Sequence, residues 1–389
     1  MKKRLLPSTL ALALTFAIPA TVLLAQSTPP KSAAQLQADQ IRELEQFLAV
    51  YKKVQASYVD KVDDKQLMEG AIQGMLASLD PHSGFLNKSD FSSLQTQIDG
   101  EYGGLGLSVT LEDEAVKVIA PTKDTPADKA GIKSGDYITH LDGKLIFGGT
   151  LDEAVDAMRG VPGTSIKLTI VRPGRDAPFD VTITRAIIDL KPVRWEVKDR
   201  IGLITITGFS EETGADVVSA VSSIKKSLGG KPLGYIVDLR SNPGGILDEA
   251  VAVSDAFLES GEIVSERGRD KRDIERWWAE RAVPGDVTGG APIIVLVDAG
   301  SASASEIVAG ALQDHHRGLV MGERSFGKGS VQNVLPLTRD TGLRLTVARY
   351  HLPSGRSVQE GGIKPDIQVP QLSDPDYKKR IAIRESDLR

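Results

Sequence analysis

The sequence predicts an α/β protein whose main core follows a strand-rich block and a helical segment. Three observations indicate this class. From about residue 193 onward, apolar strand-like runs alternate with helical stretches, which is typical of parallel strands covered by helices. Residues 100–186 instead combine short alternating runs with frequent glycines. Residues 36–79 repeat apolar side chains at helical spacing.

Composition excludes several classes of function. The 389 residues leave room for two or three domains. With a net charge of −5 and no long basic run, the chain gives no electrostatic support for nucleic-acid binding. It has no cysteine, and its 5 histidines do not follow a metal-binding spacing, so we expect neither a metal ion nor a cofactor.

The first 26 residues have the pattern of an export segment. Three basic residues precede a mostly apolar stretch that ends at Ala25, and Pro7 and Pro19 argue against a buried helix there. Leu23 is not the small residue expected three positions before a cleavage site, so the sequence leaves open whether residues 1–26 are removed or kept as an anchor. We expect export to the periplasm or cell envelope.

Residues 27–99 are expected to form a linker and two helices. Helical periodicity covers about 36–58, and a second helix begins near Asp63 or Asp64 and is stopped by Asp80-Pro81. Two short amphipathic helices cannot bury both faces alone. We therefore expect them to pack on the core or on a second subunit.

The block at 100–186 combines a glycine-rich start with a specific motif. Residues 127–138 read A-x-x-A-G-I-x-x-G-D-x-I, a helix is expected at 151–158 and a strand at 165–171. The whole block resembles a PDZ domain of the bacterial protease-associated type; the alternative is a generic β-barrel with glycine turns. The resemblance implies that an apolar peptide tail adds a strand to the domain. Its terminal carboxylate would bind the backbone N–H groups of Leu105, Gly106 and Leu107.

The region from 187 to 372 is expected to form the α/β core, with functional groups at the carboxyl ends of its parallel strands. Residues 262–290 look charged and irregular, and we expect a cap insertion there that contains Trp277 and Trp278. The polar residues 373–389 are expected to form a peripheral tail. The core strands are expected at 201–206, 235–240 and 292–297, and the helices at 216–228, 247–257 and 303–314.

A serine lies where the last of these strands turns into a helix. N–H groups at the positive end of that helix would stabilise an oxyanion beside Ser303. Serine is also a favoured helix cap, and Ser301 or Ser305 has the same residue type close by. The sequence alone does not choose among the three serines.

Lys328 stands between Gly327 and Gly329, 25 residues after Ser303. A free lysine, with a pKa of about 10.4, is charged at neutral pH, but burial among apolar groups lowers that pKa and frees the amine to act as a base. The alternative is a surface lysine in a glycine turn. Residues 322–329 also match a phosphate-binding loop up to the lysine, but Gly329 replaces the required hydroxyl residue and a strand follows.

A histidine-based triad has little support. No G-x-S-x-G motif occurs. His315 and His316 lie along the helix that Ser303 begins, too close to reach its hydroxyl. His82 and His351 are expected to make structural hydrogen bonds.

Four motifs together resemble those of the carboxyl-terminal processing proteases. They cover residues 238–245, 300–306, 323–332 and 353–357, and the resemblance extends over about 40–370. This family consists of exported Ser/Lys peptidases with a PDZ domain ahead of a crotonase/ClpP-like α/β protease core. The family pattern differs at His351, where an aromatic residue is more usual, and it does not account for the segment at 262–290.

The resemblance assigns roles to five residues. Ser303 would be the nucleophile, Lys328 the base, and Gln332 the neutral group that orients the lysine. The N–H groups of Ala304 and of one glycine of the pair Gly244 and Gly245, with Gly245 preferred, would form the oxyanion hole.

These roles imply an exported endopeptidase that binds apolar C-terminal tails of envelope proteins and cleaves upstream through an acyl-enzyme. The expected partners are protein substrates, and the expected assembly is a homo-oligomer through the N-terminal helices; whether an adaptor delivers substrates is open. The alternatives are a catalytically inactive PDZ scaffold and an acyl-CoA enzyme on the same type of core.

Overall fold

The computed structural model describes most of the chain, and its parts fall into two units. One unit extends to Met68 and the other begins at Glu69, and each is described by itself. The predicted export segment lies outside the described residues, among which no helix has the length and apolar character needed to cross a membrane. The described ranges are 32–112, 115–146, 149–270, 272–280, 285–370 and 382–388.

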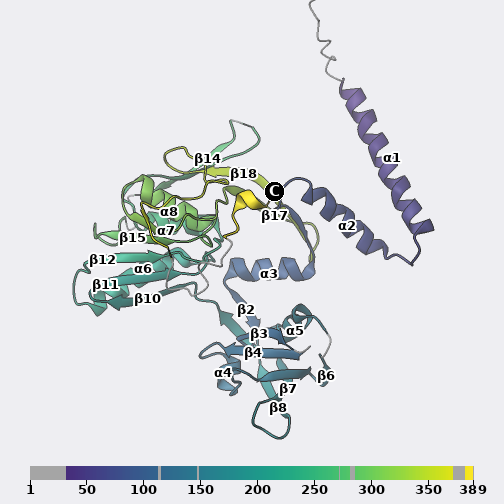
Figure 1. Ribbon diagram of the computed structural model, residues 1–389, viewed down its shortest axis with the longest axis horizontal. Coiled ribbons are helices and arrows are strands. Elements are labelled where there is room, and N and C mark those ends of the chain that lie inside the picture. Colours follow the sequence, from purple (N-terminus) through teal and green to yellow (C-terminus); the bar gives the residue numbers. More distant parts are fainter. Residues whose placement is uncertain are drawn as a thin grey trace, which may run out of the picture. The chain divides into compact units, whose positions relative to one another are not determined.

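The first unit consists mainly of the long helix α1 (Ala33–Ser57) (Figure 1). Ser32 caps it: its hydroxyl accepts from the N–H of Gln35, whose side chain accepts from the N–H of Ser32. Apolar side chains remain exposed on this helix; Leu44, for example, is 63% exposed. The helix α2 (Asp64–Ala77) follows, so both predicted helices are confirmed.

A small antiparallel domain follows α2 and two short connecting elements. Its sheet has the strand order β3-β4-β5-β7-β8, with β6 paired to β5, and Val118, Ile138 and Leu168 are completely buried in its core. The predicted helix at 151–158 and strand at 165–171 are confirmed at the same bounds. The connecting elements are β1 (Gly84–Leu86), which pairs with a strand of the main core, and the helix α3 (Lys88–Asp99). The strands β2 (Glu101–Gly104) and β9 (Ala186–Asp189) pair with each other. The remaining elements are β3 (Leu107–Glu112), β4 (Ala115–Pro121), α4 (Pro126–Lys129), β5 (Tyr137–Leu141), β6 (Lys144–Leu145), α5 (Leu151–Met158), β7 (Ser165–Val171) and β8 (Phe179–Thr184).

The main core contains the predicted parallel sheet. Its strand order is β10-β11-β12-β15-β16-β19, and all neighbours are parallel except the first pair. The helix α8 contacts β16 of this sheet and β13 of a second sheet, so a helical layer lies between the two sheets. The elements are β10 (Val193–Lys198), β11 (Ile201–Ile206), α6 (Thr213–Ser227), β12 (Gly234–Asp238), α7 (Leu247–Asp255), β15 (Ile293–Val297), α8 (Ala304–Asp314), β16 (Leu319–Gly322) and β19 (Ile367–Gln368).

The second sheet shows that the expectation of irregular structure at 262–290 is wrong for residues 262–267 and 274–279, which form strands. Its order is β1-β18-β13-β14, with β17 paired to β18. A register shift next to Ile263 interrupts the strand pairing, and Ile263 and Val264 are buried consecutively, so the regular alternation that marks a strand is lost from the sequence. Trp278 is 54% exposed. The strands are β13 (Gly261–Arg267), β14 (Ile274–Ala279), β17 (Ser330–Pro336) and β18 (Gly342–His351).

The predicted peripheral tail is also corrected in part. The short helix η2 (Glu385–Asp387) packs on the core, and Glu385 is only 4% exposed. A carboxylate so deeply buried needs partners, and His82, which is 303 residues away in the sequence, is one of them.

Candidate active site

Ser303 occupies a sharp turn between β15 and α8. Its backbone has φ 54° and ψ −115°, a conformation that non-glycine residues rarely adopt. A Cβ atom on Gly244 would lie 2.8 Å from the Cβ of Ser303, so only glycine fits beside the turn. The carboxylate of Glu306 accepts a hydrogen bond of 2.8 Å from the Ser303 N–H and fixes the turn from the first turn of α8.

The structure distinguishes the three serines of this turn. The hydroxyl of Ser301 donates to the carbonyl of Leu239 at 2.8 Å, and that of Ser305 donates to the carbonyl of Asn242 at 2.9 Å. Both side chains are completely buried and support the turn. Within the described part of the chain, the hydroxyl of Ser303 has no hydrogen-bond partner, and it lines a cavity of about 910 Å³.

The same cavity brings together all five residues predicted to act in catalysis. Lys328 and Gln332 line it together with Ser303, and so do Ala304 and Gly245. No hydrogen bond joins Ser303 to Lys328, or Lys328 to Gln332, among the described residues. The amide nitrogen of Gln332 instead donates to the hydroxyls of Ser330 at 2.9 Å and Thr346 at 3.2 Å.

Lys328 belongs to a short segment, residues 325–329, that we name the lysine loop. Glu306 holds this loop on the serine turn, because the oxygen that accepts from Ser303 N–H also accepts from Lys328 N–H at 2.9 Å. Its other oxygen accepts from Gly327 N–H at 2.8 Å and from the Ser325 hydroxyl at 2.5 Å. One buried carboxylate therefore joins the two backbones.

Tyr350 makes a second link between them. Its hydroxyl donates to the carbonyl of Lys328 and lies 3.3 Å from the carbonyl of Ser303. The side chain is buried, and burial raises the pKa of its hydroxyl well above the usual value, so it stays protonated. Neither linking residue was predicted to have a role at the site, although Ser303 and Glu306 have the S-x-x-E spacing of a helix-capping box.

Burial is the main influence on the Lys328 amine. It lowers the pKa of Lys328, and the positive charge of Arg344 lowers it further, whereas the carboxylates of Glu385, Glu306 and Asp80 act in the opposite direction. The net direction is a lowered pKa, which increases the neutral fraction of the amine.

Two backbone N–H groups at the cavity have no acceptor among the described residues. Ala304 is the first residue of α8, so its N–H has no partner within the helix. Gly244 donates to the side chain of Asn242 at 2.9 Å, whereas the N–H of Gly245 makes no hydrogen bond in the described structure. Of the two glycines, Gly245 is the one with a donor available.

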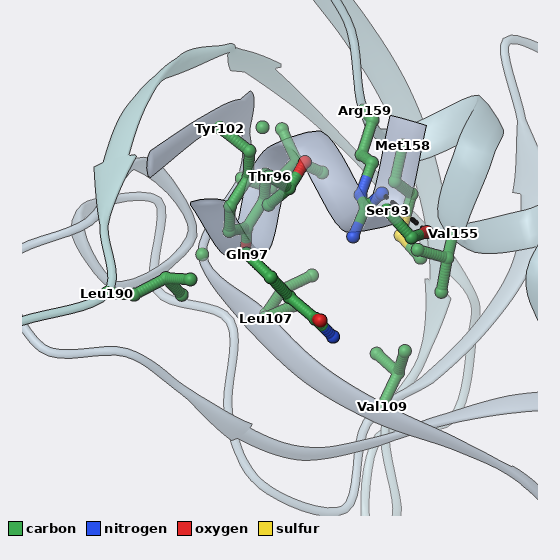
Figure 2. Close-up of a pocket in the computed structure, with 13 residues that line it drawn as sticks. Ser93, Thr96, Gln97, Tyr102, Leu107, Val109, Val155, Met158, Arg159 and Leu190 are labelled. Carbon is green, nitrogen blue, oxygen red and sulfur yellow. Dashed lines mark hydrogen bonds between the residues drawn. The ribbon is translucent and has the colours of Figure 1, made fainter. Parts of the chain in front are cut away.

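A second cavity, of about 420 Å³, lies in the small antiparallel domain (Figure 2). Leu105, Gly106 and Leu107, which were predicted to bind a peptide carboxylate, are among its lining residues. Side chains of α3 line the same space, and Arg159 donates from Nη1 to the Ser93 hydroxyl at 3.4 Å. The wall contributed by α3 was not anticipated from the sequence.

Three family models match parts of this architecture. The family model for peptidase family S41 matches residues 200–369, the model for the PDZ domain matches 117–172, and that for the activating protease CtpB N-terminal domain matches 13–90. A solved structure of the photosystem II D1 C-terminal processing protease has 29% sequence identity and a TM-score of 0.49, covering 83% of this chain and 92% of that chain.

Two curated relatives are similar over most of the chain. The carboxy-terminal-processing protease of Bartonella bacilliformis is 49% identical over 350 residues, which are 90% of this chain and 80% of that protein. The carboxy-terminal processing protease CtpA of Bacillus subtilis is 37% identical over 333 residues, covering 85% of this chain and 69% of that protein.

The chain therefore belongs to the carboxy-terminal processing proteases, which are serine-type peptidases with a PDZ domain. The predicted family, fold class and enzyme class are confirmed. Neither the generic β-barrel nor the inactive scaffold and acyl-CoA enzyme receives support.

Proposed function

We propose that this peptidase is an exported endopeptidase that uses Ser303 as nucleophile and Lys328 as general base. The main support is geometric. The hydroxyl of Ser303, which has no hydrogen-bond partner among the described residues, lines one cavity with the lysine whose pKa is lowered, and Glu306 and Tyr350 fix the two backbones to each other. Ser301 and Ser305 are unsuited to this role because their hydroxyls support the turn.

In the proposed reaction the neutral amine of Lys328 takes the proton of the Ser303 hydroxyl as its oxygen attacks the peptide carbonyl. The oxyanion that forms is stabilised by the N–H groups of Ala304 and Gly245. The lysine then gives its proton to the departing amine, and an acyl-enzyme remains. Water activated by the same amine releases the acyl group and restores the hydroxyl.

Gln332 is proposed to orient the amine without adding charge. Its Nε2 is already engaged by Ser330 and Thr346, which directs its remaining hydrogen-bonding capacity, the carbonyl oxygen, to other partners. A carboxylate at this position would raise the pKa of Lys328 and keep the base charged.

The PDZ domain is proposed to bind the apolar C-terminal tail of the substrate. Leu107, Val109 and Met158 give its cavity apolar walls, and the backbone of residues 105–107 supplies N–H donors for the terminal carboxylate. Because α3 lines the same cavity, a bound tail must contact or displace it. Tail binding is therefore a route by which substrate controls the enzyme.

Export and assembly complete the proposal. Export rests on the basic and apolar pattern of residues 1–26. A homo-oligomer formed by the N-terminal helices rests on the exposed apolar side chains of α1.

The test is turnover of a panel of unfolded proteins that differ only in their last residues, with products identified by mass spectrometry. We expect wild type to cleave apolar-tailed substrates fastest and Ser303→Ala and Lys328→Ala to be inactive while still folded. Full activity of Ser303→Ala would overturn the catalytic proposal, and equal rates for tailed and tail-stripped substrates would overturn the recognition proposal.

A further inference from the structure

The catalytic proposal leaves a buried acidic residue near the C-terminus without a role. The carboxylate oxygens of Glu385 lie 2.9 and 2.8 Å from Nε2 of His82, and one of them accepts from the side chain of Gln359 at 2.9 Å. The side chains of His82 and Glu385 are 16% and 4% exposed. We name residues 384 and 385, together with His82 and Gln359, the C-terminal clasp.

The clasp reaches the lysine loop through Gln359. Its side-chain oxygen accepts from the N–H of Gly329 at 2.9 Å, so an unbroken path leads from His82 through Glu385 and Gln359 to the residue after Lys328. The Nε2 of Gln359 donates to Glu385 and its Oε1 accepts from Gly329, so the carboxylate fixes the orientation of the Gln359 amide.

Direct contacts add to this path. The N–H of Glu385 donates to the carbonyl of Phe326 at 3.2 Å. The guanidinium of Arg384 donates to the carbonyls of Arg324 at 3.1 Å and Ser325 at 2.9 Å. The carbonyls just before the catalytic lysine are thus held by the C-terminal segment.

The loop lies directly against the backbone that carries Gln359. A Cβ on Gly329 would lie 2.8 Å from the backbone nitrogen of Gln359, and a Cβ on Gly327 would lie 3.1 Å from the carbonyl carbon of Glu360. The two glycines around Lys328 therefore allow a contact that any side chain would prevent. A small movement of the Gln359 backbone would be passed directly to the loop.

The segment that supplies His82 also reaches the proposed orienting residue. Asp80 accepts from the N–H of His82 at 2.8 Å and from the Thr346 hydroxyl at 3.1 Å. The oxygen of Thr346 in turn accepts from Gln332 at 3.2 Å. The same short segment thus supports both Lys328, through the clasp, and Gln332.

We propose that Glu385, held by His82, is a positioning residue that fixes the lysine loop so that the Lys328 amine faces Ser303. The inference rests on the proposed roles of Lys328 and Ser303, and it adds the C-terminal segment to the groups on which catalysis depends. Glu385 acts through Gln359 and the loop backbone and does not contact the substrate.

Substitution of Glu385 should change the pH dependence of kcat, a quantity that the loss of a purely structural contact would not change. Among the charged groups that act on Lys328, Arg344 lowers the pKa of its amine, whereas Glu385, Glu306 and Asp80 raise it. Removing the negative charge of Glu385 therefore favours the neutral amine, and the acid limb of the rate profile moves to lower pH. Breaking the path at Gln359 leaves all these charges in place.

The experiment uses the full chain and compares Glu385→Gln, Gln359→Leu and the exposed control Asp176→Asn with wild type. We expect both clasp variants to lose on the order of tenfold or more in kcat with little change in KM, because the amine is displaced and the substrate sites are intact. The acid limb of kcat should move to lower pH in Glu385→Gln only. Asp176→Asn should match wild type.

Ser303→Ala, measured in the same assay, separates the two proposals. If Ser303→Ala is inactive but both clasp variants keep the wild-type kcat, the clasp proposal fails and the catalytic proposal stands. If the clasp variants lose kcat and melting temperature together and the Glu385→Gln profile does not shift, Glu385 is only structural and the clasp proposal is again refuted. If Ser303→Ala is active, the catalytic proposal itself fails.

Discussion

The hydroxyl of Tyr350 gives a direct measure of how strongly the serine turn and the lysine loop are joined. It is the only partner of the Lys328 carbonyl among the described residues, and its side chain is buried. Tyr350→Phe keeps the ring and removes the donor. An unsatisfied buried partner costs about 1–3 kcal/mol, so the free energy of unfolding should fall by that amount.

The same substitution should also reduce catalysis, because the carbonyls of Ser303 and Lys328 lose the group that lies between them. We expect kcat to fall by roughly tenfold or more, since a small misplacement of a catalytic group has effects of this size. Urea unfolding gives the change in stability, and cleavage of an apolar-tailed peptide gives the change in kcat.

A second core tyrosine, Tyr235, provides a matched control, because its substitution should change the free energy of unfolding in the opposite direction. Tyr235 is also buried, but its hydroxyl has no hydrogen-bond partner among the described residues. Tyr235→Phe removes an unsatisfied polar group, so the protein should become more stable by about 1 kcal/mol or more with unchanged kcat. Equal effects of the two substitutions on stability would refute the reasoning from hydrogen bonding.

Three further predictions concern the lysine loop. Lys328→Met should abolish turnover yet raise the melting temperature in a thermal scan, because burial disfavours the charged amine; a lower melting temperature would contradict this. The free energy of unfolding of wild type should increase relative to Lys328→Met as pH rises from the lowered folded-state pKa of Lys328 toward the ordinary 10.5, because in this range the unfolded chain still binds the proton and the folded chain does not. Urea unfolding of both proteins at a series of pH values measures this difference. Gly329→Ala should cost about 1–3 kcal/mol in the free energy of unfolding because its Cβ would meet the Gln359 backbone at 2.8 Å, whereas Gly230→Ala, with nothing within 4 Å, should be nearly neutral.

The sequence could predict those features that depend on local pattern. The helix at 151–158 and the strand at 165–171 were predicted at their observed bounds because their periodicity is regular. The strand β13 was missed because an irregularity in its register accompanies three successive buried residues, Ile263 to Ser265. A pattern method detects a strand only where its alternation is intact.

At the candidate site too, residues in local motifs could be predicted, whereas residues brought in by folding could not. The motifs singled out Ser303 and Lys328, but nothing local distinguishes Ser303 from its two neighbours until the partners of each hydroxyl are known. Tyr350 and Glu385 were missed because they contact the site only after the chain has folded. The buried position of Glu385 depends on His82, and no periodicity links residues so far apart.

The two buried carboxylates reveal a conflict between positioning and acid–base chemistry. Glu306 and Glu385 hold the lysine loop, yet both raise the pKa of a lysine that must lose its proton to act as a base. Their oxygens are engaged by backbone N–H groups, a hydroxyl, an imidazole and an amide, and no hydrogen bond joins either carboxylate to the amine among the described residues. Burial and Arg344 therefore outweigh them, and the net direction is still a lowered pKa. The loop is fixed by hydrogen bonds from its backbone to carboxyl oxygens, while the amine faces a cavity with the neutral Gln332 in its wall.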